Sequence, residues 1–237
     1  MKPIYAIGDV HGQFDKLADA LELIEDDGGP DARVVVLGDL VDRGPDAFRV
    51  IELLRLGCAE GRDWTVLLGN HDQMFLEFLR TGETHHHRIV SGISWLNDRM
   101  GGKTTLASYG VDTEQPLRDM QAQARALVPQ SHVDFLNELP LVYETGGLLF
   151  VHAGLMPGVT LEEQNPEDLL WIREPFLSHE DPFEWLVVHG HTAIDAAQHY
   201  GNRVNLDSGA GRGGDLSVAV FEDNDVLLLT PMGRAVF

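Results

Sequence analysis

The stretch VVVLGDLVDRGPD, from Val34 to Asp46, sets the strictest limits on how this chain folds. Its first four residues are apolar without polar alternation, which is typical of a strand buried on both faces in an α/β sheet. The Gly-Asp step that follows marks a tight turn at the carboxyl end of that strand, where ligands bind in such sheets. The loop then holds Asp39, Asp42 and Arg43. Because these groups are costly to bury without partners, the loop predicts a bound metal and a bound anion.

The N-terminal third of the chain repeats the order strand, glycine-containing polar loop, helix three times. We expect strands at 4–7, 34–37 and 64–68, followed by helices at 14–25, 47–56 and 74–79. This alternation implies right-handed crossovers and a parallel sheet, with the three loops gathered at one edge.

The remainder of the chain follows a different pattern. Residues 81–130 suggest short helices, and we expect a helical insert that caps the active-site edge. Beyond a helix at 133–139, short apolar runs separated by turn signals predict a second, largely antiparallel sheet. These runs lie at 141–143, 148–151, 185–188, 203–206, 216–221 and 226–229. Without an internal repeat or an obvious linker, residues 1–237 are interpreted as a single α/β domain of two sheets.

Charge and cysteine content narrow the partners and the compartment. The 237 residues carry 38 acidic against 17 basic side chains, a net charge of −21, which argues against non-specific binding to nucleic acid or to a membrane surface. An anionic substrate therefore needs local positive charge at its site. The single cysteine, Cys58, fits a reducing cytosol, and no basic segment followed by an apolar segment resembles a secretory signal. We expect a cytoplasmic protein.

Three of the 11 histidines are consecutive, His85, His86 and His87, in a stretch typical of an exposed loop. Consecutive side chains do not converge on one ion in regular structure, so we expect at most adventitious metal binding there.

The remaining polar residues at the predicted strand ends form a constellation. They are Asp9, His11, Asp39, Asp42, Arg43, Asn70, His71, His152 and His191. Mixed carboxylate, imidazole and amide ligands suit Mn²⁺, our first choice, and also Fe or Zn²⁺. Asp39 is the natural bridge between two divalent ions, and ions about 3.5–4 Å apart can polarise a phosphoryl oxygen and clamp an in-line displacement.

Five short motifs carry a resemblance to a known family. They are GDVHG (8–12), GDLVDRG (38–44), GNHD (69–72), HAG (152–154) and HGHT (189–192). In this order they resemble the phosphoprotein phosphatase family within the calcineurin-like metallophosphoesterases, in its bacterial serine/threonine branch, and the match spans residues 4–207. The resemblance implies a four-layer α/β/β/α sandwich of two mixed sheets with a dinuclear metal site at the strand ends.

The resemblance also implies a role for each matching residue. The first metal is held by Asp9, His11 and Asp39, and the second by Asp39, Asn70, His152 and His191. His71 is implied to be the general acid, oriented by Asp42, because a leaving alkoxide needs a proton. Arg43 and Arg173 are implied to bind phosphate, since a guanidinium matches two phosphate oxygens and keeps its charge. His189 lies outside the metal set.

The sequence leaves three functions to weigh. The first is hydrolysis of phosphoserine or phosphothreonine by a hydroxide held at the metals, with small phosphoesters as further substrates. The second is symmetrical dinucleoside tetraphosphatase activity, because such members share Asp72 of GNHD, although they typically lack an acid at the position of Asp42. The retained Asp42–His71 pair favours the first. A non-catalytic binding module would have lost a ligand or His71, and neither is lost.

Overall fold

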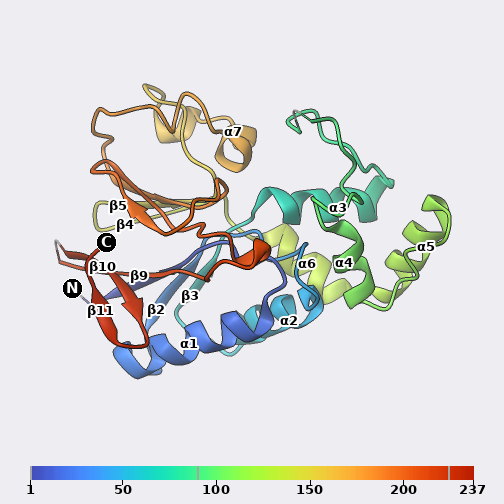
Figure 1. Ribbon diagram of the computed structural model, residues 1–237, viewed down its shortest axis with the longest axis horizontal. Helices are drawn as coiled ribbons and strands as arrows, with labels where there is room; N and C mark the ends of the chain where they lie inside the picture. Colours follow the sequence, from blue (N-terminus) through green and yellow to red (C-terminus); the bar gives the residue numbers. More distant parts are fainter. Residues whose placement is uncertain (1, 90, 224) are drawn as a thin grey trace.

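The computed structural model describes residues 2–89, 91–223 and 225–237 (Figure 1). Its α-helices are α1 (Phe14–Gly28), α2 (Ala47–Ala59), α3 (Asn70–Thr81), α4 (Gly102–Ser108), α5 (Leu117–Leu127), α6 (Gln130–Glu138) and α7 (Pro166–Trp171). Its strands are β1 (Ile4–Ile7), β2 (Arg33–Val36), β3 (Trp64–Val66), β4 (Val142–Thr145), β5 (Leu148–Val151), β6 (Leu186–His189), β7 (Gln198–His199), β8 (Arg203–Asn205), β9 (Val218–Glu222), β10 (Asp225–Thr230) and β11 (Gly233–Ala235).

The strands form two mixed sheets. The first has the order β11-β10-β9-β1-β2-β3, and β1, β2 and β3 are parallel, as the strand–loop–helix repeat predicts. The second has the order β4-β5-β6-β8-β7, with β5, β6 and β8 parallel and antiparallel strands at both edges.

Two details of the sequence interpretation were wrong. The runs at 216–221 and 226–229 belong to the first sheet, where β9 pairs antiparallel with β1 and β10 with β9. An apolar run predicts a strand but not its partner, and the edge of β1 that β2 leaves open accepts β9. The second sheet is also not largely antiparallel. Its connections at 152–185 and 190–202 are long enough to return the chain to the same end of the sheet, which a parallel pair requires.

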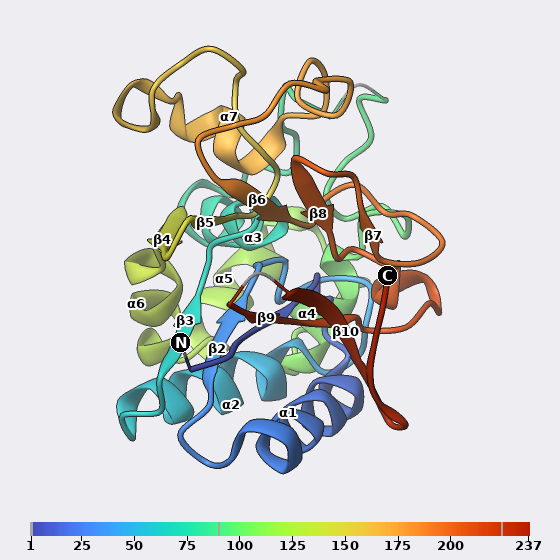
Figure 2. The same cartoon turned by 90° about the vertical axis from the view of Figure 1, so that its left-hand side faces the viewer.

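Alternate side chains of each central strand face different layers. Tyr5 and Ile7 of β1 pack with α1 and α2, whereas Ala6 faces the second sheet. Phe150 of β5 packs in that layer between the sheets, and its neighbour Leu149 packs with α7 on the outer face. Figure 2 shows the resulting order of helices, sheet, sheet and α7. The four-layer α/β/β/α sandwich is confirmed.

Helix α3 begins earlier than expected, at Asn70, so the GNHD motif forms its first turn and not a loop. The carboxylate of Asp72 accepts a hydrogen bond from the backbone N–H of Gly69 at 2.9 Å and from those of Leu40 and Val41 at 2.9 and 3.2 Å. An acid in the first turn also suits the helix dipole. Asp72 thereby fastens the loop after β2 to the start of α3.

Residues 82–89 leave α3 and run towards α7, and residues 91–101 lead into α4 (Figure 1). Helix α4 packs on α2, and α5 packs on α3. In the described part of the chain, no helix has the length and apolar character needed to cross a membrane.

The layer between the sheets generates a stability prediction. Leu67 is fully buried there, whereas Leu117 on α5 is 44% exposed. Leu67→Ala should lower the free energy of unfolding by about 2–5 kcal/mol, since it removes buried apolar contacts and leaves a cavity. Leu117→Ala is the matched control and should change it by roughly 0.5 kcal/mol or less. Urea titrations of both variants measure the difference, and equal losses would contradict this assignment of the core.

Candidate metal centre

The ends of strands from both sheets bring the predicted site residues to one edge. Asp9 and His11 follow β1, and Asp39, Asp42 and Arg43 follow β2. Asn70 and His71 open α3 directly after β3, while His152 and His191 follow β5 and β6 of the second sheet. Segments more than 100 residues apart in the sequence are therefore in contact, as between Asn70 and His191.

The backbone at this edge is strained. Positive φ angles of 48–73° occur at five of the site residues, namely His11, Asp39, Asp42, Arg43 and His191. Side chains other than glycine rarely adopt this conformation, and such strain persists where the surroundings fix it, commonly at functional sites. The loops therefore hold these side chains in place at an energetic cost.

Close backbone approach accounts for a glycine beside the cluster. A Cβ atom at Gly190 would lie 1.9 Å from a carboxylate oxygen of Asp9. Without it, the backbone N–H of His191 donates to the two Asp9 oxygens at 3.2 and 3.1 Å. The glycine thus lets the loop of the second sheet join a residue of the first.

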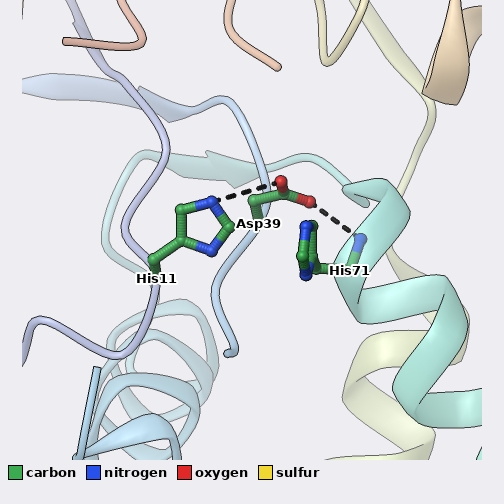
Figure 3. Close-up of side chains that lie close together, drawn as sticks. All are labelled: His11, Asp39 and His71. Carbon is green, nitrogen blue, oxygen red and sulfur yellow. Dashed lines mark hydrogen bonds and ion pairs between the residues drawn. The ribbon is translucent and has the colours of Figure 1, made fainter. Parts of the chain in front are cut away.

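The first group of ligand atoms surrounds Asp39 (Figure 3). His11 donates from Nδ1 to the backbone carbonyl of Val41 at 2.9 Å, so its Nε2 lone pair faces Asp39 Oδ2 at 3.5 Å. Burial, with nearby Arg43 and His71, lowers the pKa of His11 well below its ordinary value, which keeps this lone pair free of a proton. The backbone N–H of His71 donates to Asp39 Oδ1 at 2.9 Å.

The second group lies on the other side of Asp39. His152 donates from Nδ1 to the carbonyl of Leu37 at 2.8 Å, which leaves Nε2 facing Asn70 Oδ1 at 2.9 Å and Asp39 Oδ1 at 3.4 Å. Nδ1 of His191 lies 2.8 Å from the same Asn70 oxygen, and its buried Nε2 has no hydrogen-bond partner among the described residues. Asn70 Oδ1 therefore lies between ring nitrogens of His152 and His191.

Carboxylates add negative charge to this buried edge. Burial raises the pKa of Asp9 well above its ordinary value, and the nearby Asp207 and Asp39 raise it further. The pKa of Asp207 is raised in the same way, first by burial and then by Asp39, against a backbone hydrogen bond that lowers it. A divalent cation would relieve the repulsion among these groups.

The donor atoms fit two divalent ions. Among the described residues, one group of possible ligand atoms is His11, Asp39 and His71, and a second is Asp9, Asp39 and His152. Asp39 is common to both groups, and Asn70 Oδ1, which lies beside His152 and His191, adjoins the second. Unprotonated imidazoles, carboxylates and an amide oxygen are ligands of Mn²⁺, Fe and Zn²⁺. The carbonyl partners of His11 and His152 also fix the tautomer and orientation that a metal ligand needs.

Asp42 and His71 form a buried pair, and His71 also lies in the group of possible ligands with His11 and Asp39. Asp42 Oδ2 lies 2.5 Å from His71 Nδ1, and it also accepts a hydrogen bond from Trp95 Nε1 at 2.7 Å. Asp42 Oδ1 accepts one from Thr105 Oγ1 at 2.6 Å. Burial raises the pKa of Asp42 to about 7 and lowers that of His71 to about 3. Together the two groups therefore bind one additional proton below about pH 7.

Three arginines supply positive charge at the site. Arg43 contacts Nε2 of His11, and its Nη2 lies 3.0 Å from Nε2 of His71. Partial burial lowers the pKa of Arg173, as do the neighbouring Arg212 and Arg43. Arg212 also lowers the pKa of His71, after larger effects of burial and Arg43. Arg43, Arg173 and Arg212 therefore place three positive charges near one cluster, which favours the binding of a polyanion.

Sequence reasoning missed four residues at this site: Trp95, Thr105, Asp207 and Arg212. The sequence does contain a signal for Asp207. Asp-Ser-Gly follows the predicted strand at 203–206, just as Gly-Asp follows the earlier strands. Trp95 lies in an irregular segment before α4 and Thr105 lies in α4, and neither residue had a signal in the sequence.

His189 and the histidine triplet stay outside the cluster. Nε2 of His189 faces Arg203 at 3.3 Å. His86 and His87 both approach Glu167, at 3.9 and 2.7 Å, so consecutive histidines do converge in this irregular segment. However, the N–H of Arg88 donates to His86 Nδ1 at 3.3 Å, which directs the protonated Nε2 of His86 towards the carboxylate. We interpret this group as a hydrogen-bonded contact with α7.

Comparison with known proteins agrees with this geometry. The sequence matches the calcineurin-like phosphoesterase family over residues 2–228, and the chain belongs to that family. It is therefore a hydrolase of phosphoester bonds that depends on a dinuclear metal centre.

Relatives of this chain differ in their named activities. The chain is 30% identical to serine/threonine-protein phosphatase 1 of Salmonella typhimurium, over 91% of this chain and 90% of that protein. It is also 30% identical to a symmetrical bis(5'-nucleosyl)-tetraphosphatase of Methylococcus capsulatus, over 86% of this chain but only 57% of that protein's length. A cold-active protein-tyrosine phosphatase of Shewanella shares the fold, with a TM-score of 0.62 and 17% identity over 96% of this chain and 77% of that one.

The shared position of Asp39 generates a prediction about metal content. Asp39→Asn should reduce bound metal towards zero, because its oxygens face both groups of ligands. Asn70→Ala should reduce it towards one ion, since Asn70 faces only His152 and His191. Metal analysis after dialysis against Mn²⁺ measures both. Retention of two ions by both variants would refute the bridging position.

Proposed function

We propose that this chain is a phosphomonoesterase that removes phosphate from serine and threonine side chains of proteins. The 2.5 Å contact between Asp42 and His71, buried beside the metal ligands, carries the proposal. The alkoxide of serine or threonine is a strong base and needs a proton as it leaves, and a histidine held by a carboxylate is suited to donate one near neutral pH. A substrate with a good leaving group would not need this pair.

Each site residue has a role in this reaction. The metal ligands are Asp9, His11, Asp39, Asn70, His152 and His191. When bound, the two ions polarise the phosphoryl oxygen and activate water. His71 donates a proton from Nε2, Asp42 orients it through Nδ1, and Arg43 and Arg173 bind phosphate oxygens. Mn²⁺ is the ion we favour, with Fe or Zn²⁺ as alternatives.

A second candidate is hydrolysis of symmetrical dinucleoside tetraphosphates. Arg212 favours it, because a third cation near Arg43 and Arg173 suits a chain of phosphates better than a monoester. The tetraphosphatase relatives support it as well.

The net charge of −21 still favours a protein or a small phosphoester over nucleic acid or a membrane as the binding partner. We also propose that residues 1–237 form one domain, in which residues 81–130 are a helical insert at the site.

A substrate panel tests the choice between these activities. We expect the Mn²⁺-loaded protein to show a higher kcat/KM on phosphoserine and phosphothreonine peptides than on diadenosine tetraphosphate. A phosphotyrosine peptide serves as the control for residue specificity. A higher kcat/KM on the tetraphosphate would replace the first candidate with the second.

His71→Asn tests the chemistry directly. Removing a general acid costs about 10²–10⁴-fold in rate, and the cost depends on how strongly the leaving group needs a proton. We therefore expect a large loss of kcat on phenyl phosphate, a much smaller loss on p-nitrophenyl phosphate, and unchanged metal content.

The pH profile provides the second measurement on the same variant. Because the Asp42–His71 pair loses its additional proton above about pH 7, kcat of the parent on phenyl phosphate should fall as the pH rises through that value. The fall should be absent in His71→Asn. An equal loss on both substrates, or a loss of metal, would show that His71 holds the site together and that the acid lies elsewhere.

A further inference from the structure

The carboxylate of Asp42 has more partners than the histidine it faces. Trp95 Nε1 donates to Oδ2 at 2.7 Å, the oxygen that also faces His71 Nδ1. Thr105 Oγ1 donates to Oδ1 at 2.6 Å and accepts from the backbone N–H of Asp42 at 2.8 Å. Asp42 and Thr105 are fully buried and Trp95 is 1% exposed, so water does not compete for these contacts.

Thr105 and Asp42 are joined by two hydrogen bonds that run in opposite directions and form a closed ring. A hydroxyl has one proton, and the Asp42 N–H occupies a lone pair of Oγ1, so the proton is directed at Oδ1. With Oδ1 held by Thr105 and Oδ2 by Trp95, the plane of the carboxylate is fixed on both sides. Rotation would leave a buried acceptor unpaired, which is costly. The oxygen aimed at His71 is thus set by groups that do not touch His71.

Other contacts fix Trp95 itself. Its indole packs near Phe78 and Phe75, with ring centroids 5.0 and 6.1 Å away. Its backbone N–H donates to the carbonyl of Thr84 at 2.6 Å, and its carbonyl accepts from Gly102, the first residue of α4, at 3.0 Å. Because these contacts hold both the ring and the backbone of Trp95, they also set the direction of its indole N–H.

We propose that Thr105 and Trp95 are positioning residues for proton donation, which act on His71 through the carboxylate of Asp42. This inference rests on the proposed function of the Asp42–His71 pair and extends it to residues 81–130. That stretch then supplies two of the three side-chain donors to Asp42, and its role is more than to cover the site. In the mechanism, Thr105 and Trp95 keep the Nδ1–H of His71 on Asp42, so that Nε2 faces the leaving oxygen.

Isosteric substitutions test the inference. Thr105→Val removes the hydroxyl with little change in volume, Thr105→Ser restores it, and Trp95→Phe keeps an aromatic ring without the N–H. The matched control is Thr104→Val, because Thr104 Oγ1 donates to the carbonyl of Gly101 at 2.7 Å in the same helix turn. We expect Thr105→Val and Trp95→Phe to lower kcat on phenyl phosphate about tenfold more than on p-nitrophenyl phosphate. This is the lower end of the loss of about 10–100-fold that follows replacement of hydrogen-bond partners of metal-ligating histidines. KM and metal content should match the parent, as should all values for Thr105→Ser and Thr104→Val.

A second readout does not depend on activity. In the ¹⁵N-labelled metal-free protein, the imidazole Nδ1–H resonance of His71 should shift and exchange faster with water in Thr105→Val. The same resonance should stay at its parent position in Thr104→Val. If Thr105→Val does not fold, Trp95→Phe is judged by the same two measurements.

Each result decides between named alternatives. Equal losses on both substrates, or an unchanged His71 resonance in Thr105→Val and Trp95→Phe, would overturn the inference. If these results accompany a leaving-group-dependent loss in His71→Asn, the proposed function stands and only the positioning role falls. If His71→Asn itself shows no such dependence, the proposed function fails and the positioning role fails with it.

Discussion

Buried negative charge at one edge of two sheets is the constraint on which the rest of this structure depends. Asp9, Asp39 and Asp207 meet within the protein, and the pKa of Asp9 and of Asp207 is raised by burial and by the neighbouring carboxylates. Nδ1 of His11 and of His152 each donates to a backbone carbonyl, which turns Nε2 of each ring towards the same space. In a molecule with a net charge of −21, only cations concentrated at this edge balance the arrangement. Divalent ions and the nearby arginines meet that need together.

The fold maintains this unfavourable cluster by making the loops rigid. Left-handed backbone at residues such as Asp39 and Asp42 is unfavourable by about 1–3 kcal/mol each, and it persists because hydrogen bonds over-determine the loops. Asp72 fastens the loop after β2 to α3, and Gly190 allows the second sheet to reach Asp9. The parallel strands of both sheets direct their loops to one side, so six short segments converge although their side chains repel one another.

The sequence predicted what depends on local pattern and left open what depends on long-range contact. A buried strand followed by Gly-Asp or Gly-Asn marks a polar loop at a sheet edge, so Asp9, Asp39 and Asn70 were selected from local sequence, and the structure brings them into one buried cluster. The partner of β9 could not be found, because a strand pattern is the same at either sheet. Trp95 and Thr105 were missed for a similar reason: only their contact with Asp42, more than 50 residues earlier, distinguishes them from ordinary core residues.

Two features of the site favour different substrates, and their energetic costs are unequal. Exposed Arg212 is easily accommodated, so its presence near the cluster is weak evidence for a phosphate chain. Asp42 is different, because a carboxyl group with no exposed surface and a pKa raised to about 7 destabilises the fold when it is ionised. Three side-chain donors are arranged to hold it, and the hydrogen bonds from two of them, Thr105 and Trp95, lower its pKa again. Such a construction contributes to catalysis only where a leaving group needs a proton. The balance of costs therefore favours a phosphomonoester with a basic alkoxide over a nucleotide polyphosphate.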